Sequence, residues 1–390
     1  MTKPDVSKSI AGGSALGRKA LVLHRKLGGK LRIEPAAPVR TRADLSLIYT
    51  PGVAAVSSFV AKNPEAARTY TMKGRMVAVV SDGSAVLGLG NIGPLGALPV
   101  MEGKAALFKT FADVDAVPLV LDTQDLEKII ETVLNIAPAF GGINLEDIAA
   151  PKCFEIERRL IEKLDIPVMH DDQHGTAIVV LAGLLNALKV VDKQLSSVRI
   201  VVAGAGAAGT AITHLLHKAG ARHITVLDSK GIVASHRTDL AHHKAHLATF
   251  TNPEGRSGGL KDALRGADVF IGVSGPAIAT AGDIAVMAKD SIVFAMANPT
   301  PEIMPDEAKR GGAAIIATGR SDFPNQVNNS LVFPGIFRGA LDHHVRKITD
   351  EIKLNAAYAL AGLVKKPTPE HIVPDMFDER APKAVAKVVR

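Results

Sequence analysis

The length, composition and charge of the chain favour a two-domain α/β protein. Its 390 residues suffice for two substantial domains, each with its own core. Aromatic residues make up only 4% of the chain and tryptophan is absent, whereas glycine occurs 35 times, which suits an α/β fold with tight turns better than a β-sandwich. The net charge of +7 is thinly spread, without basic clusters interleaved with aromatic residues, so nucleic acid is not an expected partner.

The single cysteine and the hydropathy pattern bear on the compartment. Cys153 is the only cysteine, so an internal disulfide is excluded, and this fits a reducing, cytoplasmic setting. No stretch approaches the roughly 18 consecutive apolar residues that a membrane span needs, so we expect no association with a membrane.

The first half of the chain alternates between expected helices and short apolar strands. Helices are expected at 14–28, 126–135 and 152–164, and strands at 76–80, 117–121 and 165–169. Pro51-Gly52 divides the segment between Arg42 and Ala61 into a strand or loop followed by a helix. A Gly-rich segment after Gly83 becomes helical near Met101.

A long helix, expected from Gly175 to Leu188, leads into a second half with the same alternation. Strands are expected at 198–203, 224–227, 269–273, 292–295 and 314–317, with a helix at 208–218 and further helices between the later strands. This regular alternation of strand and helix predicts a parallel, doubly wound sheet.

A Gly-rich turn after the first strand of this second half is typical of dinucleotide binding. Its residues are Gly204, Ala205, Gly206, Ala207, Ala208 and Gly209. Between a strand and a helix, a G-x-G-x-x-G pattern lets the backbone approach a pyrophosphate, which then lies on the helix N-terminus. The alternative interpretation is an ordinary tight strand–helix turn.

Three residues at the end of the next strand bear on the choice between NAD and NADP. Asp228 would accept hydrogen bonds from the adenosine ribose, which favours NAD. Ser229 and Lys230 follow immediately and together could hold a 2′-phosphate, which favours NADP. The sequence leaves both cofactors open, with NADP as the first choice.

Two acidic pairs, each at the carboxyl end of an apolar stretch, form a candidate metal site. They are Glu146-Asp147 in NLEDIAAP and Asp171-Asp172 in MHDDQHGTA. Carboxylates completed by water and substrate suit Mg²⁺ or Mn²⁺ rather than zinc. Solvated or helix-capping acids are the alternative interpretation. The neighbouring His170 and His174 are expected to form hydrogen bonds or to pack rather than to bind metal.

Tyr49 and Lys104 form a candidate acid–base pair. Tyr49 is one of three tyrosines and stands just before a Pro-Gly turn. Lys104 lies in an otherwise apolar run, where loss of solvation is expected to lower its pKa. The alternative for Lys104 is a surface lysine that buries only its aliphatic stem.

Asparagines after the later strands are candidate ligands of substrate or cofactor. Asn298 could reach the nicotinamide ribose or the substrate, and the amides of Asn328 and Asn329 could bind a carboxylate, although turn formation is the alternative role. A histidine cluster, in contrast, lacks an acidic partner or a third ligand and predicts a polar, exposed helix. Its members are His236, His242, His243 and His246.

Taken together and in order, these motifs resemble malic enzymes of the short bacterial type. The matching stretches run from about residue 15 to the end of the chain and include SLIYTPGVA, VSDGSAVLGLGNIGPLGALPVMEGKAALFK, NLEDIAAPKCFEIE, IPVMHDDQHGTAIV, VVAGAGAAGTA, LDSKG, MANPTPEI and GRSDFPNQVNNSLVFPGIFRGALD. The resemblance implies metal-dependent oxidative decarboxylation of L-malate to pyruvate and CO₂, with reduction of NADP⁺ or NAD⁺, in a homodimer or larger assembly.

The resemblance also implies a division of the chain and roles for its candidate residues. The expected parts are an N-terminal α/β catalytic and metal-binding domain at 1–174, a Rossmann-type domain at 175–345, and C-terminal helices at 346–390 that pack back on the first domain. The matching positions are Glu146, Asp147 and Asp172 for the metal ligands with Asp171 beside them, Lys104 for the general base, Tyr49 for the general acid, and Asn298 and Asn329 for contacts with cofactor or malate.

One position departs from the larger malic enzymes. Where they place a malate-binding arginine just before GLG, this chain has Ala85-Val86-Leu87, so the group that binds the second carboxylate of malate is not identified.

Two other functions remain as alternatives. A malolactic-type enzyme would recycle bound NAD and release lactate, whereas a catalytically silent dinucleotide or metabolite sensor would not need Tyr49, Lys104 and the carboxylates.

Overall fold

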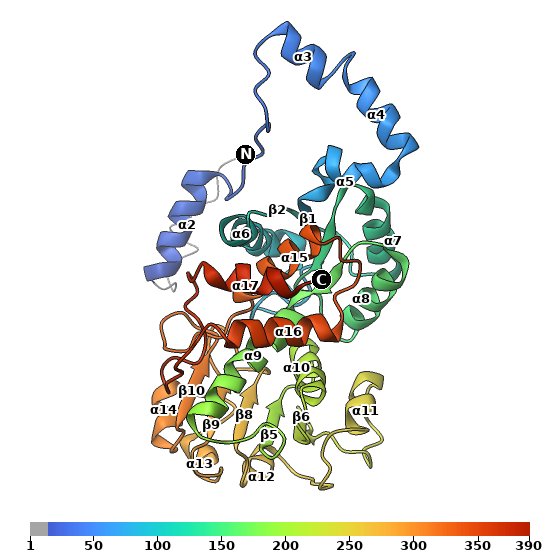
Figure 1. Ribbon diagram of the computed structural model, residues 1–390. Helices are drawn as coiled ribbons and strands as arrows, with labels where there is room; N and C mark the ends of the chain where they lie inside the picture. Colours follow the sequence, from blue (N-terminus) through green and yellow to red (C-terminus); the bar gives the residue numbers. More distant parts are fainter. Residues whose placement is uncertain (1–14) are drawn as a thin grey trace, which may run out of the picture.

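Two β-sheets organise the computed structural model, which describes residues 15–390 (Figure 1). The first 14 residues of the predicted N-terminal domain lie outside the described residues. The first sheet is parallel and has the order β2-β1-β3-β4. Its strands are β1 (Met76–Ser81), β2 (Asp115–Val120), β3 (Gly142–Leu145) and β4 (Val168–His170).

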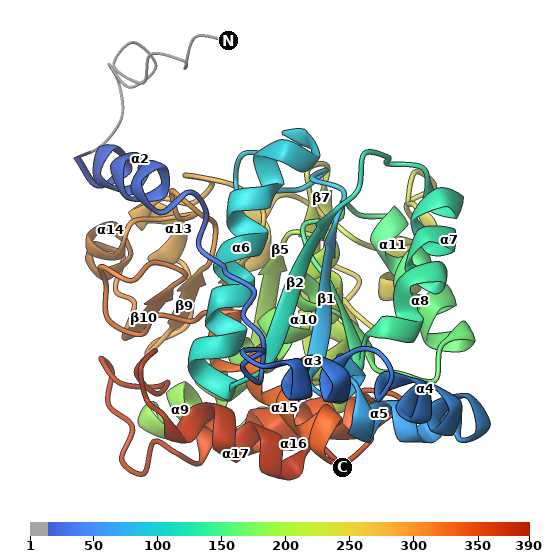
Figure 2. The same ribbon diagram turned by 90° about the horizontal axis from the view of Figure 1, so that it is seen from above.

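β1 lies inside the first sheet because its side chains are apolar on both faces. Val77 and Val79 pack in one core cluster with residues of α6, whereas Ala78 and Val80 pack in another with α7 and α8. Figure 2 shows these helices on opposite sides of β1 and β2. They are α6 (Gly93–Ala112), α7 (Leu126–Ile136) and α8 (Lys152–Lys163). A continuous apolar run is therefore what a parallel strand covered on both faces requires.

The second sheet has the order β10-β9-β8-β5-β6-β7. Its strands are β5 (Arg199–Ala203), β6 (His223–Asp228), β7 (Gly231–Ile232), β8 (Val269–Gly272), β9 (Ile292–Ala295) and β10 (Ile315–Thr318). If β5 is taken as the first strand, β6 and β7 follow it on one side and β8, β9 and β10 on the other. This is the strand order of a dinucleotide-binding doubly wound sheet. The predicted α/β class is confirmed, with one difference: β7 is short and antiparallel to β6, because it follows β6 directly through a tight turn rather than through a helix.

A buried helix, α9 (Asp171–Val190), connects the two sheets. It begins four residues before the predicted start at Gly175, because Asp171 and Asp172 form its first turn, where acidic side chains favour the positive end of the helix dipole. α9 packs against α10 (Ala207–Lys218) of the second sheet, so one apolar cluster runs through both halves.

The C-terminal helices lie between the two sheets (Figure 1). They are α15 (Phe333–Asp342), α16 (Asp350–Ala361) and α17 (Arg380–Val388). α15 and α17 contact α6, whereas α16 contacts α9 and α10. Because these helices touch elements of both halves, the domain boundaries at 174 and 345 stay predictions.

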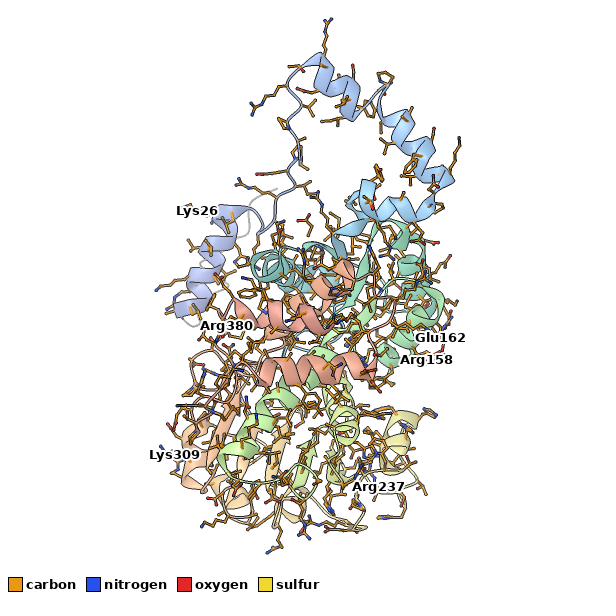
Figure 3. All side chains as sticks on the ribbon, in the orientation of Figure 1. Lys26, Arg158, Glu162, Arg237, Lys309 and Arg380 are labelled. Atoms are coloured by element: carbon orange, nitrogen blue, oxygen red, sulfur yellow. The ribbon has the colours of Figure 1, made fainter. Side chains whose placement is uncertain are left out.

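Two helical stretches are long and apolar enough to cross a membrane by length and composition, contrary to the expectation from the sequence. In Asp171–Val190, 72% of the most apolar window is buried, as expected for a core helix. Arg42–Lys62, which we call the arm, is 0% buried. It comprises α3 (Arg42–Ile48) and α4 (Val53–Lys62) and stands away from the body, following α2 (Ala15–Leu27) and an extended segment (Figures 1 and 3).

Candidate active site

A cavity of about 1110 Å³ lies between the first sheet and the nucleotide-binding sheet. Its wall combines α6, the segments after β3 and β4, and the Gly-rich turn before α10. The candidate residues that line it are Lys104, Glu146, Asp147, Asp172, Gly206, Ala207, Ala208, Asn298, Asn328 and Asn329. The cavity therefore brings together most of the residues selected from the sequence.

The carboxylates converge because β3 and β4 are neighbouring parallel strands that end at the same edge of the sheet. Glu146 and Asp147 follow β3, and Asp172 lies in the first turn of α9 directly after β4. One oxygen of each lies within 4.8 Å of the others. Asp147 Oδ2 is buried and has no hydrogen-bond partner among residues 15–390. An unpartnered buried carboxylate in an oxygen-only donor set fits a hard divalent cation.

Burial and mutual repulsion shift the pKa values of these acids upward. Burial and the neighbouring Asp172 raise the pKa of Asp147 to about 9. Burial also raises the pKa of Asp172 to about 6 and that of Asp171 to about 7, although Lys104 opposes both shifts. Three buried acids, Glu146, Asp147 and Asp171, and the half-buried Asp172 favour the binding of a cation that would hold them ionised.

Lys104 is the buried cation of this centre. Its Nζ donates a 2.6 Å hydrogen bond to Glu146 Oε1 and a second one to Asp171, and it lies 4.2 Å from the centre of the Phe333 ring. Burial alone would lower the pKa of Lys104, but Asp171 and Glu146 raise it above the ordinary value. The predicted lowering is wrong for the chain without a cation, because the apolar run around Lys104 does not reveal the two acids that face it.

A buried carboxylate that sequence reasoning missed holds the start of α9. Glu157 on α8 accepts a 2.7 Å hydrogen bond from the His170 backbone N–H, and its other oxygen contacts Gln173 Nε2 at 3.1 Å and His174 Nε2 at 3.0 Å. The feature that could have revealed Glu157 is its position on the apolar face of α8, one helical turn after Cys153. Both side chains are buried. His174 thus forms a hydrogen bond, as predicted.

The three glycines of the dinucleotide turn meet three different steric demands. Gly204 has φ +124, and a Cβ there would lie 2.6 Å from Val273 O. A Cβ on Gly209 would lie 1.7 Å from Gly204 O, so α10 packs closer to its strand than any side chain allows. Gly206, the N-cap of α10, faces open space. The turn therefore leaves an unobstructed helix N-terminus suited to a pyrophosphate.

The carboxylate of Asp228 already accepts hydrogen bonds from cationic side chains. Arg237 Nη1 lies 2.9 Å from Oδ1, and Lys244 Nζ lies 2.8 Å from Oδ2. Although burial would raise the pKa of Asp228, hydrogen bonds from these two side chains hold it at about 2. Arg237 lies below α11 (His242–Ala248) in the nucleotide-binding half (Figure 3). Asp228 is therefore less available to a ribose than its position in the sequence suggests.

A second cavity, of about 850 Å³, continues from the Gly-rich turn past this cluster. Asp228, Ser229 and Lys244 line it, whereas the Nζ of Lys230 pairs with Asp239 Oδ2 at 2.8 Å. Ser229 and Lys244 therefore face the space where an adenosine ribose would lie.

All three asparagine candidates, Asn298, Asn328 and Asn329, line the first cavity. Asn328 also accepts a 2.9 Å hydrogen bond from the Ser330 N–H, which is the turn chemistry considered as its alternative role. A Cβ on Gly88 would lie 1.9 Å from Asn298 O, so the loop after β1 approaches the loop after β9 closely at this point.

The structure does not bring Tyr49 to Lys104 within one chain. Tyr49 follows α3 in the arm, is 65% exposed and does not line the cavity. The predicted acid–base pair is therefore not formed within one chain, because the arm carries Tyr49 away from the body.

The histidine cluster holds no metal group. Among residues 15–390, the only set of at least three acids, histidines or cysteines close enough to share an ion is the carboxylate set of the cavity. As predicted, the cluster is largely exposed: His236, His242 and His246 are exposed, and only His243 is half-buried, with its Nε2 3.1 Å from Ala205 O.

Comparison with known proteins gives the family. The model for "Malic enzyme, N-terminal domain" matches residues 28–161, and that for "Malic enzyme, NAD binding domain" matches residues 173–389. The chain is 54% identical over 96% of its length to the bifunctional malic/malolactic enzyme of Bacillus subtilis, covering 92% of that protein. It is 50% identical over 93% of its length to an NADP-dependent malic enzyme of Halomonas elongata, covering 86% of that protein.

A solved structure agrees in fold over nearly the whole chain. The crystal structure of an NAD-dependent malic enzyme from Thermotoga maritima superposes with a TM-score of 0.92 at 51% identity, covering 95% of this chain and 98% of that one. Both cofactor types occur among these relatives. The chain therefore belongs to the malic enzyme family, as an NAD(P)-dependent malate dehydrogenase of the oxaloacetate-decarboxylating type.

Proposed function

We propose that the cavity between the two sheets is the active site for oxidative decarboxylation of L-malate to pyruvate and CO₂, with NADP⁺ or NAD⁺ as the acceptor. The main support is the shared wall: Lys104 and the carboxylates face the same space as the Gly-rich turn. Hydride transfer followed by decarboxylation needs a base, a cation site and a nicotinamide within reach of one substrate.

Glu146, Asp147 and Asp172 would hold Mg²⁺ or Mn²⁺ in this site. A bound divalent cation supplies Lewis acidity toward substrate oxygens, which stabilises the negative charge that develops as CO₂ departs. Asp171 stays outside the set and keeps its contact with Lys104, so it orients the lysine rather than the cation.

Lys104 is the proposed base for the 2-hydroxyl proton, taken while hydride leaves C2 for the nicotinamide. The amine must be uncharged to accept that proton. Pairing of Glu146 with a cation would weaken one of the two carboxylate interactions that raise the pKa of Lys104, which brings it toward a working range.

Titration with L-malate in the presence of Mn²⁺ and each cofactor tests this assignment. We expect cofactor reduction, with pyruvate formed in equal amount, only when the metal is present. Reduction that is unaffected by a chelator would contradict the assigned metal site.

We further propose that a second copy of the chain supplies Tyr49 as the general acid that protonates C3 of the enolate. The arm exposes apolar side chains that a homodimer could cover, among them Leu47 (79% exposed) and Phe59 (45% exposed). In a two-fold assembly each arm reaches the other body, so each active site would combine Tyr49 of one chain with Lys104 of its partner.

Mixing two inactive variants tests this arrangement. Tyr49→Phe and Lys104→Ala proteins, unfolded and refolded together, should recover about a quarter of wild-type turnover, because half of randomly paired dimers are mixed and each mixed dimer holds one intact site. Tyr49→Phe refolded alone is the control. No recovery in dimers shown to be mixed would place Tyr49 in its own chain's site.

For the cofactor, we propose that NADP⁺ is preferred. Asp228 is paired with Arg237 and Lys244, so the end of β6 offers positive charge to a 2′-phosphate. Lys244→Ala should lower kcat/KM with NADP⁺ and leave kcat/KM with NAD⁺ nearly unchanged. An equal loss with both cofactors would show a structural role for Lys244.

A malolactic activity is the second candidate, because a relative at 54% identity is described as bifunctional. It would release lactate without net absorbance from reduced nicotinamide, so lactate and reduced cofactor should be measured in the same reaction.

We propose that the enzyme acts in the cytoplasm, since its single thiol, Cys153, is buried and free.

A further inference from the structure

The active-site cavity has a shortage of positive charge for a dicarboxylate. Four acids, Glu146, Asp147, Asp171 and Asp172, outweigh Lys104 and a divalent cation by one negative charge. The segment where larger malic enzymes place an arginine contributes only Ala85 and Leu87 to the wall. A malate dianion that enters this space therefore needs a further cation, or its second carboxylate is desolvated without a partner.

Lys30 is the other positively charged side chain in the wall of this cavity. It lies in the extended segment that leaves α2 and runs beside α6 (Figure 2). Its backbone N–H donates a 3.1 Å hydrogen bond to Glu102 Oε2, and its Nζ donates a 2.6 Å hydrogen bond to Pro99 O. Nζ also lies 3.7 Å from the position that a Cβ on Gly103 would take. The ammonium group is thus held on the turn of α6 that carries Lys104.

The ammonium group of Lys30 has unused hydrogen-bonding capacity. It carries three N–H donors, and within residues 15–390 the only acceptor in hydrogen-bond range of Nζ is Pro99 O. Lys104, in contrast, already donates hydrogen bonds to two carboxylates, Glu146 and Asp171. Of the two cations that line the cavity, Lys30 is therefore the one whose ammonium group has no hydrogen bond to a carboxylate among residues 15–390.

We propose that Lys30 is a specificity-determining residue that pairs with the carboxylate of malate farther from the metal. This inference rests on the proposed malate site. It replaces the arginine missing at Ala85 by a lysine from a different part of the chain. Because the ion pair forms when substrate binds and is not strengthened during hydride transfer, its loss should raise KM more than it lowers kcat.

The competing explanation is that Lys30 only fastens its segment to α6. Glu102 offers a matched control, because it accepts the backbone N–H of Lys30 but does not line the cavity. Glu102→Gln weakens the attachment and removes a negative charge that attracts the Lys30 ammonium, whereas Lys30→Met keeps the length of the side chain and removes its charge.

Calorimetric titration of the Mn²⁺-loaded full-length protein, without cofactor, separates these explanations. L-Malate is compared with L-lactate, which has the same 2-hydroxy acid group but lacks the second carboxylate. We expect Lys30→Met to weaken malate binding about 10- to 100-fold, as for loss of a charged hydrogen bond, and to leave lactate binding unchanged. Lys30→Arg should restore most of the affinity, and Glu102→Gln should bind malate at least as tightly as wild type, because it removes a negative charge that competes for Lys30.

The outcomes distinguish failure of this inference from failure of the proposed function. If wild-type protein shows no Mn²⁺-dependent malate binding, the proposed site itself is wrong. If wild type binds and Lys30→Met binds equally well, or if Lys30→Met and Glu102→Gln lose malate and lactate affinity together, Lys30 is not the carboxylate partner. Thermal melting of each variant checks folding, and Lys30→Gln replaces Lys30→Met if the latter is unstable.

Discussion

The cavity and the arm differ in how much of their chemistry one chain completes. In the cavity, Lys104 is buried and pairs with the buried carboxylates of Glu146 and Asp171. In the arm, Tyr49 and its apolar neighbours are exposed and contact little. Burial of an ion cluster requires a closed shell of protein, whereas exposed apolar side chains stabilise only when a partner covers them. The first region is completed by folding of one chain, and we propose that the second is completed by association of two.

The largest expected effect tests the part that one chain completes. Lys104→Ala should lower kcat for malate oxidation about 10²- to 10⁴-fold, because the base for the hydroxyl proton is lost. Fluorescence titration with NADP⁺ should show nearly unchanged affinity, since Lys104 belongs to α6 and not to the Gly-rich turn. Unchanged turnover would remove Lys104 from the mechanism.

The next effect tests the part that association completes. Leu47→Asp places a charge on the exposed apolar face of the arm and should shift the protein toward monomers in sedimentation, with loss of turnover. Phe377→Asp is the control, because Phe377 is 78% exposed but lies outside the arm. A Leu47→Asp monomer with full activity would show that each chain works alone.

A moderate effect is expected from the support of the carboxylates. Glu157→Gln keeps the shape of the side chain but weakens its hold on the start of α9, and it should lower Mn²⁺ affinity about 10-fold. Glu162→Gln is the matched control on the same helix, because Glu162 is exposed and pairs with Arg158 (Figure 3). Equal Mn²⁺ binding in both variants would contradict the positioning role.

The smallest effect concerns the stability of the body rather than its chemistry. Burial, followed by the nearby His246, lowers the pKa of His214 to about 4. A depressed histidine pKa contributes stability above the unfolded value, and that contribution falls as pH drops from about 6.5 toward 4. Wild type should lose about 1 to 2 kcal/mol more than His214→Phe between pH 7 and pH 5 in urea unfolding. Parallel pH profiles would show that His214 does not titrate on unfolding.

The cofactor turn could be predicted from a short sequence pattern because its steric requirements arise among residues that are close in sequence. Gly204, Gly206 and Gly209 are adjacent in sequence, and each answers a steric requirement within one strand–turn–helix unit. The charge state of Lys104 was predicted wrongly because it depends on Asp171, which is distant in sequence and is brought close only by the pairing of β3 with β4. Glu157 was missed for the same reason, because its hydrogen-bond partners lie in the next strand and helix.

The sequence by itself determined the α/β class, the order of the strands and helices, the dinucleotide turn and the acidic pairs, since these follow from periodicity and short-range motifs. Only the tertiary structure decided which of these residues meet. It gathered Glu146, Asp147 and Asp172 at one sheet edge, paired Asp228 with Arg237 and Lys244, and directed the arm away from the cavity. The physical reason is that electrostatic and packing partners lie far apart along the chain, where periodicity carries no information about distance.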